Sequence, residues 1–91
     1  MTAGDGRFAV RVMVTDVWDQ VFLAVEPRTA VSELKRQALT QALKRDDARL
    51  EDYVVKFRGA RVLDESTTLG ALGAVANAPF IVLPARRQPV R

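Results

Sequence analysis

The spacing of apolar residues near the start of the chain predicts two β-strands. In residues 7–15 (RFAVRVMVT) and again in 20–25 (QVFLAV), apolar side chains recur at every second position. The residues that share the apolar side are Phe8, Val10, Val12 and Val14 in the first segment and Val21, Leu23 and Val25 in the second. A period of two is typical of a half-buried strand. The short polar turn 16–19 (DVWD) joins the segments and Pro27 ends the second one, so the pattern predicts a β-hairpin with one apolar face.

After Pro27 the period changes to that of a helix. Residues 28–45 place their apolar side chains three or four positions apart, on one broad side of a predicted helix. That side consists of Val31, Leu34, Ala38, Leu39, Ala42 and Leu43, and the opposite side of Glu33, Arg36, Gln37, Thr40 and Lys44. We expect Thr29 to be the N-cap, with Glu33 in the first turn and Lys44 and Arg45 in the last, where their charges suit the helix dipole.

The second half of the chain reads as short elements separated by turns. A charged connection (46–52) leads to a third strand (53–58) with Val55 and Phe57 pointing inward, a tight turn at Gly59 and Ala60, and a short strand (61–63). Residues 67–72 are expected to form one helical turn, or a turn with a buried leucine. After Pro79 comes a final strand, 80–83 (FIVL). Because this strand is wholly apolar, we expect it in the middle of the sheet, parallel to the first strand.

The order strand, strand, helix, strand, short strand, strand predicts an α+β fold of the β-grasp type. A mixed sheet of four to five strands would pack its apolar face on the one main helix. Ninety-one residues are enough for one core and too few for two, so a single domain is expected. We place a flexible lead-in at 1–7, the domain at 8–84 and a polar, basic tail at 85–91.

Composition narrows the chemistry that this domain can perform. The sequence has no cysteine and no histidine, which removes disulfides, thiolate metal sites, and the commonest general base and metal ligand. Asp64 and Glu65 are adjacent in an extended segment, so their carboxylates point apart. Ser66, Thr67 and Thr68 have no histidine to activate them. We therefore expect no catalytic, cofactor-binding or metal-binding residues, and no enzyme activity.

Charge and hydropathy bear on location and partners. Fourteen Lys and Arg face eleven Asp and Glu, a net charge of +3, so electrostatic steering of partners is weak. No apolar run approaches the ~20 residues of a transmembrane helix, and the start of the chain does not resemble a signal peptide. A cytoplasmic location is expected.

The motifs in residues 8–87 resemble those of the ubiquitin-like family. The resemblance rests on the hairpin, on four helix residues, and above all on residues 56–72, KFRGARVLDESTTLGAL. The four helix residues are Val31, Leu34, Lys35 and Ala38. In the last stretch a strand ends in an aromatic residue, Phe57, and a turn follows at Gly59. After the turn come a short strand with Val62 or Leu63 inward, an acidic pair and a Thr-Leu pair. The resemblance implies a β-grasp domain that acts by binding other proteins.

The end of the sequence departs from the conjugated members of this family. Ubiquitin-like modifiers and sulfur carriers end in Gly-Gly, whereas this sequence ends ARRQPVR and has its glycines at 4, 6, 59, 70 and 73. Conjugation is not expected unless the natural chain continues beyond Arg91. The resemblance then favours a stand-alone bacterial ubiquitin-like protein, such as those that accompany type VII secretion systems, or a domain of a longer chain. The arginine- and alanine-rich composition suits a GC-rich bacterial source.

The expected binding surface also differs from that of ubiquitin. By resemblance, the isoleucine of ubiquitin's contact patch corresponds to Lys56, its turn leucine lies near Val17 and Trp18, and its last-strand valine corresponds to Ile81 or Leu83. A charge at position 56 implies that the partners of ubiquitin itself do not bind. We predict a different protein partner, and the predicted partner-binding residues are Arg11, Met13, Trp18, Lys56, Arg58, Ile81 and Leu83.

Several interpretations stay open. The Trp18 ring either folds back over the sheet edge, which its large apolar area favours, or anchors an interface. Arg11, Lys56, Arg58 and Arg61 form either a solvated sheet face, which we favour, or a basic binding face. Two other functions remain as alternatives: a modifier or sulfur carrier whose Gly-Gly is absent from this sequence, and a weak binder of nucleic acid or anionic surfaces. The second lacks the interleaved aromatics that such sites use.

Overall fold

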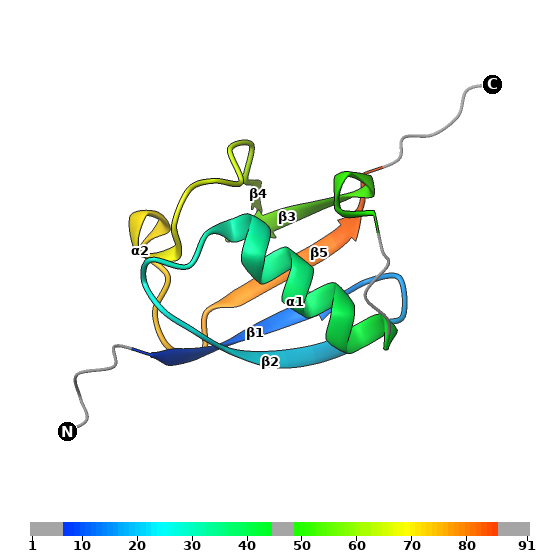
Figure 1. The fold of residues 1–91 in the computed structure, drawn as a ribbon, viewed down its shortest axis with the longest axis horizontal. Coiled ribbons are helices and arrows are strands. Elements are labelled where there is room, and N and C mark those ends of the chain that lie inside the picture. The colour runs from blue at the N-terminus through cyan, green and yellow to red at the C-terminus, as the bar shows by residue number, and fades with distance from the viewer. Residues whose placement is uncertain (1–6, 45–48, 86–91) are drawn as a thin grey trace.

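A five-stranded mixed sheet packed on one long helix makes up the fold (Figure 1). The computed structural model describes residues 7–44 and 49–85. The elements are β1 (Phe8–Val14), β2 (Asp19–Val25), α1 (Val31–Leu43), the 3₁₀ turn η2 (Leu50–Asp52), β3 (Tyr53–Phe57), β4 (Ala60–Arg61), α2 (Leu69–Leu72) and β5 (Pro79–Pro84). The predicted α+β fold of the β-grasp type is confirmed.

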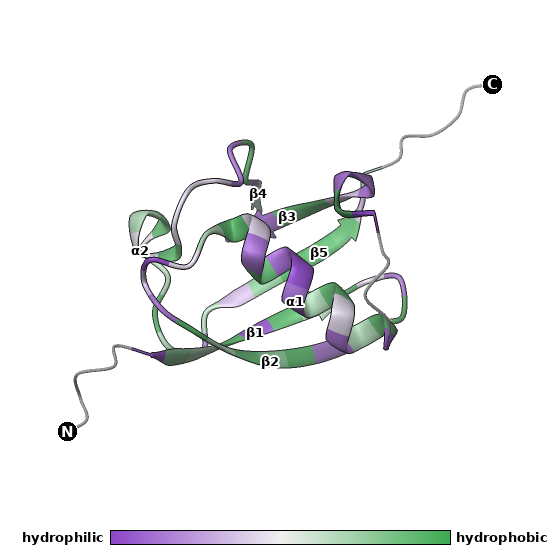
Figure 2. Ribbon diagram, in the orientation of Figure 1, coloured by the Kyte–Doolittle hydropathy of each residue, from purple (hydrophilic) through white to green (hydrophobic). Residues whose placement is uncertain are grey.

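The last strand occupies the centre of the sheet. The strand order is β2-β1-β5-β3-β4, and β5 pairs in parallel with β1 and antiparallel with β3. Val12 of β1 lies opposite Phe80, and Val55 of β3 lies opposite Val82. Figure 2 shows apolar residues along β5 between its two neighbours. The central position predicted from the run FIVL is therefore confirmed, although only Phe80 and Val82 of this strand are buried and Ile81 is exposed on the other face of the sheet.

The core lies between α1 and the inward side of the sheet. Most of the predicted inward residues of both hairpin strands are buried, while Phe8 is half-buried. From α1 the buried apolar side chains are Val31, Leu34, Ala38, Leu39 and Ala42. Near the end of β3 the Phe57 ring stacks on that of Phe80, with 4.7 Å between ring centroids. This pair closes the core at the side of the β3–β4 hairpin.

The helix begins in a way that its local sequence does not reveal. The N-cap is Ala30, not the predicted Thr29, and its side chain makes no capping bond. Instead, the Val31 N–H donates to the Thr67 carbonyl and the Ser32 N–H to that of Glu65, each at 2.9 Å. The Thr29 hydroxyl accepts a hydrogen bond from the Glu26 N–H in the preceding turn. A distant loop thus satisfies the free N–H groups that a side chain would otherwise cap.

The C-terminal end of α1 also differs from the prediction. Lys44 is the C-cap, in the left-handed conformation with φ of 62°, and no basic residue lies in the last turn. Arg45 and positions 46–48 of the predicted charged connection are outside the described residues, and its remainder contains η2. The lead-in up to position 6 and the tail from position 86 onward also lie outside them. Within the tail predicted for 85–91, the Ala85 N–H donates to the Asp52 carbonyl at 2.7 Å.

The β3–β4 turn is one residue earlier than predicted. Arg58 and Gly59 are the two central residues, with φ of 56° and 83°, and the following strand is only Ala60–Arg61. A two-residue hairpin with both φ values positive is a type I′ turn, which matches the twist of the strands that it joins. Val62 is buried, and its N–H donates to the Val55 carbonyl at 2.9 Å, whereas Leu63 is 82% exposed. Val62 is therefore the inward member of the Val-Leu pair.

Candidate functional site

The face of the sheet that α1 does not cover is the candidate site. The strand registers place Gln20, Met13, Ile81, Lys56 and Arg61 in one row that crosses all five strands. Together with the adjacent rows we define this outer face by the apolar residues Met13, Phe22, Val54, Ile81 and Leu83 and the basic residues Arg11, Lys56 and Arg61. Each of these residues alternates along its strand with residues that enter the core.

The middle of the outer face is apolar and open to solvent. Phe22 is 57% exposed and Ile81 is 39% exposed, while Met13 and Leu83 are half-buried. Met13 lies directly opposite Ile81 across the β1–β5 pair, and Phe22 is opposite Arg11 on the neighbouring pair. The adjoining pair is therefore Ile81 and the half-buried Met13, and apolar side chains grouped at a surface are typical of protein contact surfaces.

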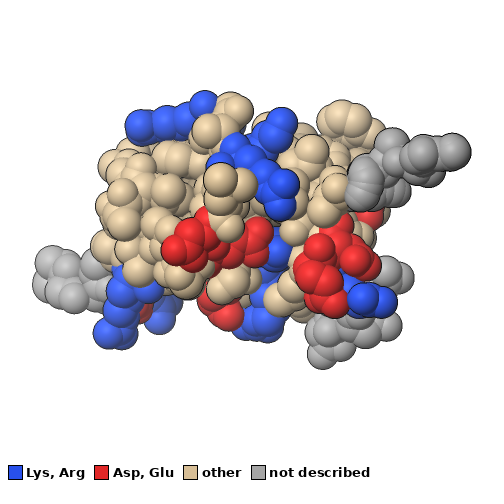
Figure 3. All heavy atoms as spheres, turned by 90° about the horizontal axis from the view of Figure 1, so that it is seen from above, with Lys and Arg blue, Asp and Glu red and all other residues tan. Residues whose placement is uncertain are grey.

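Basic groups surround this apolar centre. Lys56 lies between Ile81 and Arg61 in the central row, and the Arg11 guanidinium donates from Nε to the Asn77 carbonyl at 3.2 Å. Within residues 7–44 and 49–85, no carboxylate forms an ion pair with Arg11, Lys56 or Arg61. In Figure 3 the upper part of the surface carries basic groups without acidic ones, and the lower part carries both. The outer face is therefore basic as well as apolar.

The structure brings most of the predicted binding residues onto this one face. Arg11, Met13, Lys56, Ile81 and Leu83 all belong to it. The two others lie in turns, Trp18 between β1 and β2 and Arg58 between β3 and β4. The Arg58 guanidinium carbon is 4.9 Å from the centroid of the Phe57 ring, a cation–π contact.

The favoured interpretation of Trp18 is wrong. Its side chain is 77% exposed and does not fold back over the sheet edge, and its φ of 50° is uncommon for a bulky residue. The turn itself is held in place, because the Thr15 N–H donates to the Val82 carbonyl at 3.0 Å and the Tyr53 hydroxyl to Asp16 at 2.5 Å. Trp18 is therefore presented to solvent on an anchored turn.

Two features were not predicted from the sequence: the position of Phe22 on the outer face and the burial of Lys35. Phe22 was not singled out, although the alternation that buries Val21 and Leu23 places it on the opposite face. Lys35 is 3% exposed; its Nζ lies 2.6 Å from a Glu65 carboxylate oxygen and donates to the Tyr53 carbonyl at 2.9 Å. Its position one helical turn after Val31, on the apolar stripe, is the signal that could have identified it.

The carboxylates of Asp64 and Glu33 accept hydrogen bonds from side chains close to them in sequence. The Ser66 hydroxyl and then its backbone N–H donate to Asp64 and lower the pKa of that carboxyl. On α1, hydrogen bonds from Arg36 and then Gln37 lower the pKa of Glu33 in the same way. Among the described residues no group of three His, Cys, Asp or Glu side chains gathers where a metal could bind. Nor does any helix in that part of the chain have the length and apolarity to cross a membrane.

Comparison with solved structures identifies the fold. The ubiquitin of Caldiarchaeum subterraneum superimposes with a TM-score of 0.72 over 92% of this chain and 100% of its own. This chain has the ubiquitin-like fold. A protein designed de novo on the basis of ubiquitin reaches a TM-score of 0.76, over 97% of this chain and 100% of its own. The ubiquitin-like domain of an Arabidopsis thaliana protein gives 0.73, over 98% of this chain and 88% of its own.

The sequences of these neighbours have diverged widely from this one. Identity is 15% for the Caldiarchaeum ubiquitin and 16% for each of the other two. No protein-family model and no curated protein matches the sequence. The similarity therefore shows the fold, and a function has to be argued from the surface of this chain.

Proposed function

We propose that this protein is a non-catalytic, ubiquitin-like interaction module that binds a protein partner through the outer face of its sheet. The observation that carries the proposal is the row Met13–Ile81–Lys56, in which the half-buried Met13 and the exposed Ile81 stand beside a lysine without an ion-pair partner among the described residues. A face of this kind gains by burying its apolar centre. The ubiquitin-like fold of the structural neighbours supports the same class of function.

The chemistry of the outer face indicates the kind of protein surface that it binds. Phe22 and Ile81 supply apolar area to be buried, and Arg11, Lys56 and Arg61 form a basic rim. A complementary partner has an apolar centre with aspartate or glutamate around it, since opposite charges at a rim steer association and suppress wrong partners. Trp18 extends the proposed surface at the β1–β2 turn, because exposed tryptophan is enriched among residues that dominate binding energy. The proposal does not depend on conjugation, and a small secretion-system accessory protein is one setting that it fits.

The test is a quantitative affinity pull-down from the source organism. The bait is the full chain, compared with Ile81→Glu, Lys56→Glu and Trp18→Ala, and with Arg36→Glu as a charge-matched control on the solvent side of α1. Each variant is first checked for an unchanged circular dichroism spectrum. We expect a protein recovered with the wild type and with Arg36→Glu to be lost or strongly depleted with the first two variants.

The recovered protein is then titrated against the ¹⁵N-labelled chain. Chemical shift changes are expected at the amides of Met13, Phe22, Lys56 and Ile81, on the outer face. If the same proteins are recovered with every bait, or if the purified partner shifts amides on α1 instead, the outer face is not the binding surface. A covalent adduct of this protein with an activating enzyme would favour the modifier alternative.

A further inference from the structure

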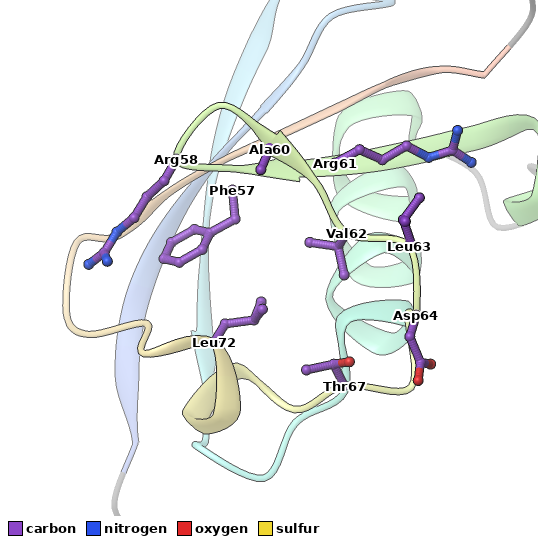
Figure 4. A pocket seen from close by; sticks show the side chains of 9 residues that line it. All are labelled: Phe57, Arg58, Ala60, Arg61, Val62, Leu63, Asp64, Thr67 and Leu72. Carbon is purple, nitrogen blue, oxygen red and sulfur yellow. The ribbon is translucent and has the colours of Figure 1, made fainter.

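A hollow beside the β3–β4 hairpin forms a second candidate site, on the opposite side of β3 from the outer face. Its volume is about 460 Å³, within the range of ~300–1,000 Å³ that is usual for ligand pockets. Figure 4 shows the side chains of Phe57, Val62, Thr67 and Leu72 converging on it from β3, the segment after β4 and α2. Three of these four side chains are apolar.

The inner surface of the hollow is rigidly supported. Phe57 and Val62 are each less than a tenth exposed, and the stack of Phe57 on Phe80 holds the ring in place. On the other side α2 is fixed at its start, because the Leu69 N–H donates to the Thr29 carbonyl at 2.9 Å and the Gly70 N–H to the Pro27 carbonyl at 2.7 Å. A preformed apolar surface binds a ligand without first ordering itself, which reduces the entropic cost of association.

Two arginines border the hollow. In Figure 4 the side chain of Arg58 lies beside Phe57 at one border of the hollow, that of Arg61 extends outward from the opposite border, and that of Asp64 points away. Neither guanidinium pairs with a carboxylate among the described residues, and the carboxylate of Asp64 is held by Ser66. The stacking of Arg58 on Phe57 keeps one positive charge directly beside the apolar surface.

We propose that this hollow binds a short acidic peptide segment of a protein partner, with one apolar side chain inserted against Phe57, Val62 and Leu72. Carboxylates that flank this side chain pair with Arg58 on one side and Arg61 on the other. The separation of the two arginines across the hollow favours a chain of residues over a single small molecule, since its interior offers mainly Thr67 as a polar group to orient a small ligand. The hollow shares Arg61 with the outer face, but its apolar lining of Phe57, Val62 and Leu72 does not belong to that face, and the inference goes beyond the function proposed above.

The probes are acetylated and amidated five-residue peptides with two aspartates on each side of a central leucine, phenylalanine or tryptophan. They are titrated into the ¹⁵N-labelled full chain and followed at the amides of Val62, Leu63, Thr67 and Leu72. Comparison peptides have alanine at the centre, or asparagines in place of the aspartates. We expect saturable shifts at these amides with at least one probe, and weaker binding of both comparison peptides.

Variants at the two arginines test the charge complementarity. Arg58→Asp keeps a residue that tolerates positive φ, and Arg61→Asp is its counterpart across the hollow. Each is expected to weaken binding about fivefold, which is the largest effect usual for one exposed ion pair. Arg49→Asp is an equal charge change next to η2, at a residue that pairs with Glu51 and Asp52 and does not line the hollow, and it should leave the dissociation constant within about twofold.

Three outcomes would overturn the inference: no saturable shift at the hollow with any probe, equal affinity for the alanine peptide, or equal weakening by Arg49→Asp. Shifts confined to Met13, Phe22 and Ile81 would also overturn it, while agreeing with a binding role for the outer face. Failure of the pull-down, by contrast, would leave a positive titration of the hollow intact. The titration therefore tests the hollow, and the pull-down tests the outer face.

Discussion

The ion pair between Lys35 and Glu65 provides a sharp test of how this fold is held together. It joins α1 to the loop that caps the start of the same helix and leads from β4 to α2. The two side chains differ in environment, since that of Lys35 is 4% exposed and that of Glu65 is 24% exposed. Removal of the two charges should therefore have unequal effects. We compare Glu65→Gln, which keeps the shape but removes the charge, with Lys35→Met, which keeps the unbranched apolar stem.

The expected magnitudes follow from these environments. Leaving one member of a fully buried ion pair without its partner costs ~3–5 kcal/mol. Water reaches part of Glu65, and Lys35 retains its hydrogen bond to the Tyr53 carbonyl, so we expect Glu65→Gln to lower the free energy of unfolding by about 2 kcal/mol. Lys35→Met leaves a carboxylate that water can solvate and should cost about 1 kcal/mol or less. The double variant should resemble Lys35→Met, because no buried charge remains.

Urea unfolding followed by circular dichroism measures these differences through the shift of the midpoint at constant slope. For a domain of this size 1 kcal/mol corresponds to roughly 4–8 °C in Tm, so Glu65→Gln should melt about 8–16 °C below the wild type. The loss should change little between low and high salt, since buried pairs are poorly screened. The reasoning is refuted if Glu65→Gln costs less than about 0.5 kcal/mol, or if Lys35→Met costs as much as Glu65→Gln.

Three further predictions follow from the turns and the exposed carboxylates. Gly59→Ala should lower the free energy of unfolding by about 1–2 kcal/mol, because φ is 83° there, while Gly59→Asn should cost less; equal losses would contradict the turn assignment. Trp18 fluorescence should be close to that of tryptophan in water and change little on unfolding; a strongly blue-shifted folded spectrum would show that the ring is covered. Hydrogen bonds lower the pKa of Glu33 from its ordinary value of 4.5 and that of Asp64 from 3.8. Both carboxylates therefore stabilise the folded state at pH values above these, and this stabilisation is lost as the pH falls through the pKa values of the folded state. With no histidine in the sequence, stability should be flat from about pH 6 to 8 and fall below about pH 4, and a transition near neutrality would contradict this.

The fold was largely predictable because its elements follow the periodicity of the sequence. The alternation of Val10, Val12 and Val14 and the stripe from Val31 to Ala42 identified strand and helix, and both face the core as predicted. The wholly apolar run at the end of the chain identified the central strand. Such patterns are local, and a one-residue shift would expose the whole apolar set, so they specify each element and its inward side.

The candidate site was only partly predictable. Alternation alone places Arg11, Met13 and Lys56 on the outward side, but the row that joins Met13 to Lys56 through Ile81 depends on strand register. The hollow beside the β3–β4 hairpin needs Leu72 from α2 to lie near Phe57 from β3. The periodicity of neither segment predicts that these two residues lie close together.

The sequence by itself determined the elements, their inward faces, the central position of the last strand and the absence of histidine and cysteine chemistry. Only the tertiary structure decided how the helix is capped, that Lys35 is buried against Glu65, that Trp18 is exposed, and which side chains share the outer face and the hollow. The physical reason is sequence separation. Periodicity records which residues avoid water, whereas caps, ion pairs and surfaces arise between segments that only the packed sheet and helix bring together.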